Sequence, residues 1–176
     1  NIKNAVPFLH QDPDSDEILG QCEESGRDQG HATLCVSLMG AFCQMAYSIG
    51  EDLFAFDNYR AVAMAEYVGK YNLIKDEAFN KGTLVGDDFV YDSNSFPYTS
   101  YSNPSYTNTT ISTDQRGTKR PAWELFYGYC KAKGISSIYS GKWAEQMRPD
   151  GGGGNYGPNS GGFDQLGFGT LMYYRE

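Results

Sequence analysis

The fold depends most on residues 31–49, which read HATLCVSLMGAFCQMAYSI. Apolar side chains recur in this stretch at spacings of three and four residues, the period of an α-helix with one wide buried face. Gly50 follows directly, where the end of a helix favours a glycine. The stretch therefore predicts a long helix packed against a core, with the rest of the chain arranged around it.

Further helices are expected along the chain, over residues 58–73, 121–134 and 138–147. Asn58 is a suitable N-cap for the first of them. Pro121 suits the first turn of the next, and Gly134 suits its end. Patterns of alternating polar and apolar residues are scarce, so the expected fold class is all-α, in a single domain over residues 1–176.

Two long connections interrupt the helices, over residues 76–115 and 150–169. The first has no Lys or Arg from residue 82 onward and holds several tyrosines among Ser, Thr and Asn. A connection this long inside a domain is functional or disordered, and its tyrosines favour function. The second is rich in glycine, but no strand precedes it and no GK[ST] follows, so a phosphate-binding loop is not expected.

The composition gives a weak indication of a carbohydrate ligand. The chain holds 14 Tyr, 10 Phe and 2 Trp, and its formal net charge is −8. Aromatic rings stack on sugar rings as well as filling a core. The negative charge disfavours nucleic acid and anionic membranes as partners, and a polyanionic glycan would need a local positive site. No uninterrupted apolar stretch is long enough for a membrane span.

The acidic N-terminal segment, residues 1–23, reads as irregular. Asp12, Asp14, Asp16 and Glu23 match four positions of a calcium-binding loop, but Glu17 stands where the sharp turn requires glycine. A solvated acidic loop is the favoured interpretation.

The cysteines at positions 22, 35, 43 and 130 form no CxxC pair. With only two histidines in the chain, a zinc site is not expected. Cys22 could pair with another cysteine, but the spacing alone does not decide this.

The densest polar cluster is EESGRDQGH, residues 23–31, directly before the long helix. A helix N-terminus offers free amide groups and partial positive charge. His31 could serve there as a neutral base, a proton donor or a substrate ligand. Alternatively the cluster is a capping loop, with Asp28 or Ser25 as the cap and Arg27 paired with Glu23 or Glu24.

A second cluster, RGTKRPAWELFY at residues 116–127, concentrates positive charge after the long stretch without cations. Arginine can bind a carboxylate through two parallel hydrogen bonds. Tyr127 lies seven residues after Arg120, two helical turns along, so both could face one side. The alternative is that the cations are solvated and Tyr127 packs in the core.

The stretch ESGRDQGHATL (24–34), continuing to AEYVGKYNL (65–73), resembles the signature region of the alginate-lyase family. The segments RGTKRPAWELFY (116–127) and RPDGGGGNYGPNSGGFDQLGFGTL (148–171) resemble later blocks of bacterial members. The resemblance implies the C-terminal portion of an (α/α) toroid, an incomplete barrel of paired helices whose N-terminal part is missing here. It also implies a periplasmic or secreted enzyme that cleaves an acidic polysaccharide, of alginate or glucuronan type, by β-elimination without a cofactor.

Elimination removes the proton beside the uronate carboxylate and expels the 4-oxygen of the next sugar. The carboxylate charge must be neutralised, a base must take the proton, and an acid must protonate the leaving oxygen. The base is His31 or a tyrosinate, whose pKa nearby cations would lower. The candidate catalytic residues are His31, Tyr98, Tyr101, Tyr127, Arg116 and Arg120. The candidate substrate-binding residues are Glu24, Arg27, Gln29, Asp164 and Gln165.

Two other functions compete with the lyase. A glycoside hydrolase needs two carboxyl groups across the glycosidic bond, which Glu24, Asp28 and Glu124 could supply. A non-catalytic glycan-binding fragment would keep the aromatic residues without turning over substrate.

Overall fold

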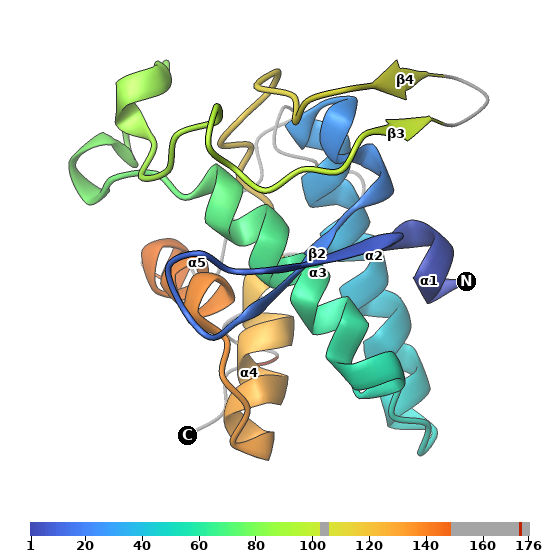
Figure 1. Cartoon of the computed structure of the whole chain (residues 1–176). Helices are drawn as coiled ribbons and strands as arrows, with labels where there is room; N and C mark the ends of the chain where they lie inside the picture. Colours follow the sequence, from blue (N-terminus) through green and yellow to red (C-terminus); the bar gives the residue numbers. More distant parts are fainter. Residues whose placement is uncertain (103–105, 149–172, 174–176) are drawn as a thin grey trace.

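The computed structural model describes residues 1–102, 106–148 and 173. Its centre is an antiparallel helical hairpin of α2 (Gln29–Ser48) and α3 (Phe56–Asn72), which pack side by side (Figure 1). The periodicity of residues 31–49 and 58–73 predicted both helices to within two residues at each end. Because the hairpin is antiparallel, the first turn of α2 and the last turn of α3 lie at the same end of the molecule.

The start of α3 differs from the prediction, because Asn58 is not its N-cap. Asp57, Asn58 and Tyr59 have φ values of 50°, 58° and 60°, in the left-handed region of the backbone. Asn and Asp tolerate this region better than most residues. The turn brings the Asp57 carboxylate to the Arg60 guanidinium at 2.5 Å, and Arg60 also donates to the carbonyl of Val6 at 2.7 Å. Asn58 therefore helps to form the turn that leads into the helix.

The second helical pair consists of α4 (Trp123–Lys133) and α5 (Ile138–Met147), which contact each other and α3. The bounds of α5 agree with those predicted from the sequence. The expected start of α4 at Pro121 was two residues too early. Gly134 ends α4 as expected, with a φ of 68° that an L-residue with a side chain rarely adopts.

The N-terminal segment is ordered, which corrects the expectation of an irregular acidic stretch. A short helix, α1 (Ile2–Ala5), precedes an antiparallel hairpin of β1 (Phe8–Gln11) and β2 (Ile18–Gln21), which lies across α3 (Figure 1). The approach is so close that a Cβ atom on Gly20 would lie 2.8 Å from the backbone nitrogen of Met64. Only glycine fits at this position.

The long connection between α3 and α4 holds a second antiparallel pair, β3 (Tyr101–Ser102) and β4 (Thr107–Asn108). Short 3₁₀ turns lie at η1 (Glu23–Gly26), η2 (Asp76–Ala78) and η3 (Gly86–Asp88). The observed fold is therefore rich in helix with two small hairpins, and the expectation of an all-α chain was too simple. None of the helices in the described ranges is long and apolar enough to cross a membrane.

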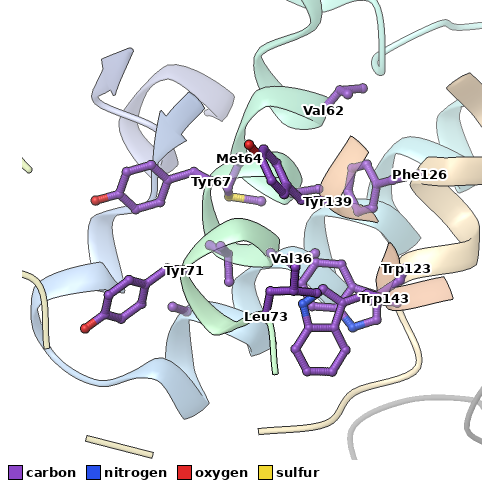
Figure 2. Packing of buried hydrophobic residues seen from close by; sticks show 14 of the residues in the cluster. Val36, Val62, Met64, Tyr67, Tyr71, Leu73, Trp123, Phe126, Tyr139 and Trp143 are labelled. Carbon is purple, nitrogen blue, oxygen red and sulfur yellow. The ribbon is translucent and has the colours of Figure 1, made fainter. Parts of the chain in front are cut away.

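The core is aromatic and gathers around α3. Trp123 of α4 and Trp143 of α5 stack with ring centroids 5.2 Å apart, while Tyr67 and Tyr71 extend from another side of α3 (Figure 2). Both tyrosine rings meet the edge of Phe96, from the long connection. Residues 61–72 of α3 are buried without interruption, so this helix has no solvent-facing side along most of its length.

Burial of α3 places a lysine in the interior, and this explains the acidic residues before β2. The Lys70 side chain is 1% exposed, and its ammonium contacts the carboxylates of Asp12 and Asp14. Tyr139 also donates to Asp12 at 2.6 Å. Burial alone would raise the pKa of Asp12, but the hydrogen bonds from Lys70 and Tyr139 outweigh it and lower the pKa to about 2. Asp12 is thus a buried ion-pair partner of Lys70, and the favoured interpretation of a solvated acidic loop was wrong for this residue.

Replacing Lys70 by Met is expected to lower the free energy of unfolding by about 3–5 kcal/mol, because it leaves the buried carboxylate of Asp12 without its partner. Lys81→Met is the matched control. Lys81 pairs with Asp88 at 2.6 Å, but its side chain is 46% exposed, so its loss should cost less than about 1 kcal/mol. Urea denaturation of both variants measures the difference, and equal losses would contradict the buried ion pair.

Glu66 is the second buried charged residue of α3, and it connects α3 to α5. Its two carboxylate oxygens accept the backbone N–H groups of Tyr139 and Ser140, at 2.8 and 3.0 Å. These donors belong to the first turn of α5, where no intrahelical acceptor exists. Burial nevertheless outweighs the hydrogen bonds and raises the pKa of Glu66 from 4.5 to about 7.

This raised pKa predicts a loss of stability as the pH increases. The folded state favours protonated Glu66, so its contribution is complete below pH 4.5 and is lost as the pH rises through 7, by roughly 3 kcal/mol. Urea unfolding between pH 5 and 8 should show this decline, and Glu66→Gln should flatten it. Glu77→Gln, at an exposed position, should keep the wild-type slope. If the stability of Glu66→Gln fell with pH as steeply as that of the wild type, another titrating group would be responsible for the loss.

Candidate functional site

The first turn of α2 holds a carboxylate–imidazole pair formed by Asp28 and His31. Asp28 is the N-cap, and its Oδ1 accepts the backbone N–H of His31 at 2.8 Å. Its Oδ2 lies 2.7 Å from Nδ1 of the His31 ring. One buried carboxylate therefore caps the helix and orients the histidine, whose side chain is 41% exposed.

This geometry fixes the tautomer of His31. An ionised carboxylate only accepts hydrogen bonds, so Nδ1 must donate to Asp28 and Nε2 keeps its lone pair in the neutral ring. A neutral imidazole with its second nitrogen held in this way is the usual form of a histidine general base. Asp28 was predicted as a possible cap, but its contact with the His31 ring was not, although His31 stands three residues after it, a spacing that the sequence shows.

Gln29 is a structural anchor, in contrast to its predicted role as a substrate ligand. It is 1% exposed, and its amide nitrogen donates to the carbonyls of Ser25 and Ser112, both at 3.0 Å. Its amide oxygen accepts from Asn72 at 2.9 Å, and Asn72 in turn accepts from the backbone of Gly117 at 2.9 Å. Both amide hydrogens of Gln29 are committed to the protein. Asn72 was missed because nothing in its local sequence indicates a partner in α2.

The two arginines predicted to neutralise a uronate also bind backbone carbonyls. Arg116 donates to the carbonyls of Tyr71 and Tyr91 at 2.8 and 2.6 Å, and its guanidinium lies over the ring of Tyr71. Arg120 is 8% exposed and donates to Thr33 Oγ1 at 3.2 Å and to the carbonyl of Gly30 at 3.3 Å. Arg120 therefore lies beneath the first turn of α2, and Arg116 joins the end of α3 to the long connection.

Arg27 is a more accessible cation beside the Asp28–His31 pair. Its side chain is 45% exposed, and its guanidinium lies 3.3 Å from Glu24 and 3.6 Å from Asp28. Glu24 and Arg27 were both predicted to bind substrate, and the structure pairs them with each other along η1 and the following turn, with Arg27 also beside Asp28.

Tyrosines of the long connection lie against η1. Tyr106 donates to the carbonyl of Glu23 at 2.7 Å. The hydroxyl of Tyr98 lies against Gly26: a Cβ atom added to Gly26 would be 2.2 Å from the Tyr98 hydroxyl oxygen. The same hydroxyl donates to the carbonyl of Asn108 at 3.4 Å. Burial raises the pKa of Tyr98, and burial together with the charges of Glu23 and Glu24 raises that of Tyr101. The expected lowering of a tyrosine pKa by nearby cations is therefore wrong for both, and they are neutral hydroxyl groups.

Tyr127 lies apart from these residues. Its ring packs against α5, so that a Cβ atom added to Gly141 would lie 3.1 Å from the ring. The guanidinium of Arg148 lies over the same ring, 5.3 Å from its centroid. The prediction that Tyr127 and Arg120 share one side of α4 is wrong, because Arg120 turns toward α2. Asp164 and Gln165 lie outside the described residues.

A polar groove runs along the long connection and consists of two adjoining cavities. The larger, of about 690 Å³, is lined by residues including Lys75, Tyr91, Asp92 and Arg116. The smaller, of about 360 Å³, includes Tyr98 and shares Ser93, Asn94 and Thr113 with the larger.

The groove approaches the first turn of α2 through Gln115, which lines the larger cavity. A Cβ atom on Gly30 would lie 2.3 Å from its Oε1. His31 is near the groove but does not line either of the two cavities in the described part of the chain.

An imidazole oriented by a carboxylate, an exposed guanidinium and tyrosine hydroxyls lie around η1 and the first turn of α2. Within residues 1–102 and 106–148, no three His, Cys, Asp or Glu side chains converge in a way that could hold a metal ion. No family model, no curated protein and no solved structure matches this chain.

Proposed function

We propose that this chain belongs to a polysaccharide lyase that cleaves a uronate-containing glycan, of alginate or glucuronan type, by β-elimination. The observation that carries the proposal is the Asp28–His31 pair, in which a buried carboxylate holds a partly exposed imidazole through Nδ1. β-Elimination requires such a base, because the proton beside the uronate carboxylate is only weakly acidic. The likeness of residues 24–34 to the alginate-lyase signature supports the same reaction.

His31 is assigned as the base and Asp28 as its positioning residue. The raised pKa values of Tyr98 and Tyr101 favour the protonated phenol, which suits the acid that returns a proton to the leaving 4-oxygen. Both tyrosines belong to the segment that covers η1, whereas Tyr127 contacts α5. Tyr98 and Tyr101 are therefore the favoured proton donors.

The uronate carboxylate requires a cation in a chain whose net charge is −8. Arg27 is assigned this role, since it is partly exposed and lies beside Asp28, the residue that positions the base. Arg116 and Arg120 act indirectly, by holding the backbone on which the groove and the first turn of α2 depend.

The finer architecture is proposed as part of an (α/α) toroid in a periplasmic or secreted enzyme. The pairs α2–α3 and α4–α5 supply consecutive packed helices, as such a toroid requires. The outer face of α2 exposes large apolar side chains one helical turn apart, which further helices of the same toroid would cover: Leu38, Phe42, Met45 and Ile49.

The arrangement of carboxylates disfavours a glycoside hydrolase. Asp28 is committed to His31 and to the helix cap, and Glu24 is paired with Arg27. Glu124 is 3% exposed and bonded to Arg148 at 3.1 Å, on α4. A hydrolase needs two carboxyl groups facing each other across the scissile bond, and these three have other partners.

The test is the absorbance of the conjugated product during incubation with alginate, glucuronan and other polyuronates. His31→Ala is expected to reduce turnover by about 10²–10⁴-fold through loss of the base, and Asp28→Asn by at least about 10²-fold through the wrong tautomer. The matched control is His10→Ala, which removes the other histidine, bonded to Gln21 and stacked on Tyr67. It should keep activity to within a few fold.

The other functions give different results in the same assay. New reducing ends without ultraviolet absorbance would indicate a hydrolase. A glycan-binding module would bind oligouronates without forming any product. In that case His31→Ala would only weaken binding. Equal activity in His31→Ala and the wild type would remove His31 from the mechanism.

A further inference from the structure

Gln115 lies between the polar groove and the first turn of α2. It is exposed and lines the larger cavity, and its Oε1 would be 2.3 Å from a Cβ atom added to Gly30. Oδ1 of Asp28 lies 3.2 Å from the same point, and the other oxygen of that carboxylate contacts the ring of His31. Gln115 therefore connects the groove to the Asp28–His31 pair.

The backbone of Gln115 has a conformation that a glutamine rarely adopts. Its φ is 54°, in the left-handed region, and Gly117 in the same turn has a φ of 81°. Glycine tolerates this region, whereas a residue with a long side chain occupies it at an energetic cost. Strain of this kind is concentrated where a side chain is needed for binding or catalysis.

Backbone groups anchor the turn at Gln115 independently of its side chain. The carbonyl of Asp114 accepts the N–H of Gln29 at 2.8 Å. The carbonyl of Gln115 accepts from the N–H and the hydroxyl of Thr118, at 3.3 and 2.7 Å. The side-chain amide of Gln115 has no hydrogen bond to the part of the chain that the structure describes. It can therefore bind a ligand without losing a contact within the protein.

We propose that Gln115 is a substrate-binding residue, whose amide donates a hydrogen bond to a sugar of the glycan that runs from the groove to His31. Oε1 is the amide atom nearer to Gly30, so Nε2 lies farther from the helix, where it can donate. The hydroxyl and carboxylate oxygens of a uronate both accept from such a group. This role rests on the proposed lyase function and adds a contact that holds the sugar beside the base.

The first experiment compares variants of Gln115 in the ultraviolet assay, with the polyuronate that the wild type cleaves. Gln115→Ala should raise KM by about 3–10-fold through the loss of one hydrogen bond, and kcat should stay within about 2-fold. Gln115→Glu should raise KM further, because it removes the donor and places a negative charge beside a polyanion. The control is Gln44→Ala, which removes a glutamine bonded to Ser48 at the other end of α2 and should keep the wild-type KM.

Gln115→Gly separates substrate binding from a structural role. It should raise KM as Gln115→Ala does, while the thermal midpoint stays at the wild-type value or rises by about 2–4 °C, because glycine adopts this backbone conformation without strain. A lower thermal midpoint together with an unchanged KM would mean that the side chain supports the fold, and would overturn the proposal.

Gly30→Ala tests where the amide has to lie. Its new Cβ atom would displace the end of the Gln115 side chain, so KM should rise as in Gln115→Ala. The double variant should be no worse than Gln115→Ala alone, since both changes remove the same contact. Additive losses would show that Gly30→Ala acts on another group, such as Asp28, and would contradict this position of the amide.

A binding measurement distinguishes this proposal from the lyase assignment. Oligouronates prepared from alginate and glucuronan are titrated calorimetrically into His31→Ala, with and without Gln115→Ala. The second substitution should raise Kd by about 3–10-fold, even if no form of the chain turns over substrate. Equal Kd values would overturn the role of Gln115 and leave the lyase assignment intact. A folded wild type that binds none of the oligouronates would overturn both.

Discussion

The hydrogen bond between Gln29 and Asn72 is the interaction on which the candidate site depends. It joins the first turn of α2 to the last turn of α3, at the shared end of the helical hairpin. Through their remaining groups, the same two side chains hold the carbonyls of Ser25 and Ser112 and the amide of Gly117. Because a buried amide without partners is costly, these bonds favour the arrangement in which the side-chain amides of Gln29 and Asn72 are both satisfied. That arrangement also places Asp28 and His31.

The central position of α3 also determines how the N-terminal hairpin and α5 are held in place. Glu66 and Lys70 are four residues apart, a spacing that on an exposed helix gives a salt bridge between neighbours. Here both are buried, and they point to different partners: Glu66 to the start of α5, and Lys70 to Asp12 near the hairpin β1–β2. Charged groups in the interior thus determine where the surrounding elements dock, and the N-terminal hairpin is part of the core for this reason.

Helical periodicity was sufficient to predict α2, α3 and α5 closely, and Gly134 marked the end of α4. The strands β1 and β2 were not predictable, because each is only four residues long and the buried partner of Asp12 is 58 positions away along the chain. The candidate site residues could be named from the sequence, but most of their contacts could not. The cluster 23–31 indicated a site before α2, whereas Arg116 and Arg120 looked like a positive surface. Their carbonyl partners belong to distant segments, which local sequence does not show.

The environments of the titratable groups give the proposed division of acid and base roles its physical basis. Asp28 is an acceptor-only group, so it keeps the proton of His31 on Nδ1 and leaves Nε2 able to take another. Near η1, burial and the charges of Glu23 and Glu24 raise the pKa of Tyr101, because they disfavour its phenolate form. A tyrosinate base would have to form against both effects, whereas a tyrosine that donates a proton would recover it from solvent between turnovers. Burial and the charges of Glu23 and Glu24 thus disfavour a phenolate at Tyr101, which supports the proposal of histidine as the base and tyrosine as the acid.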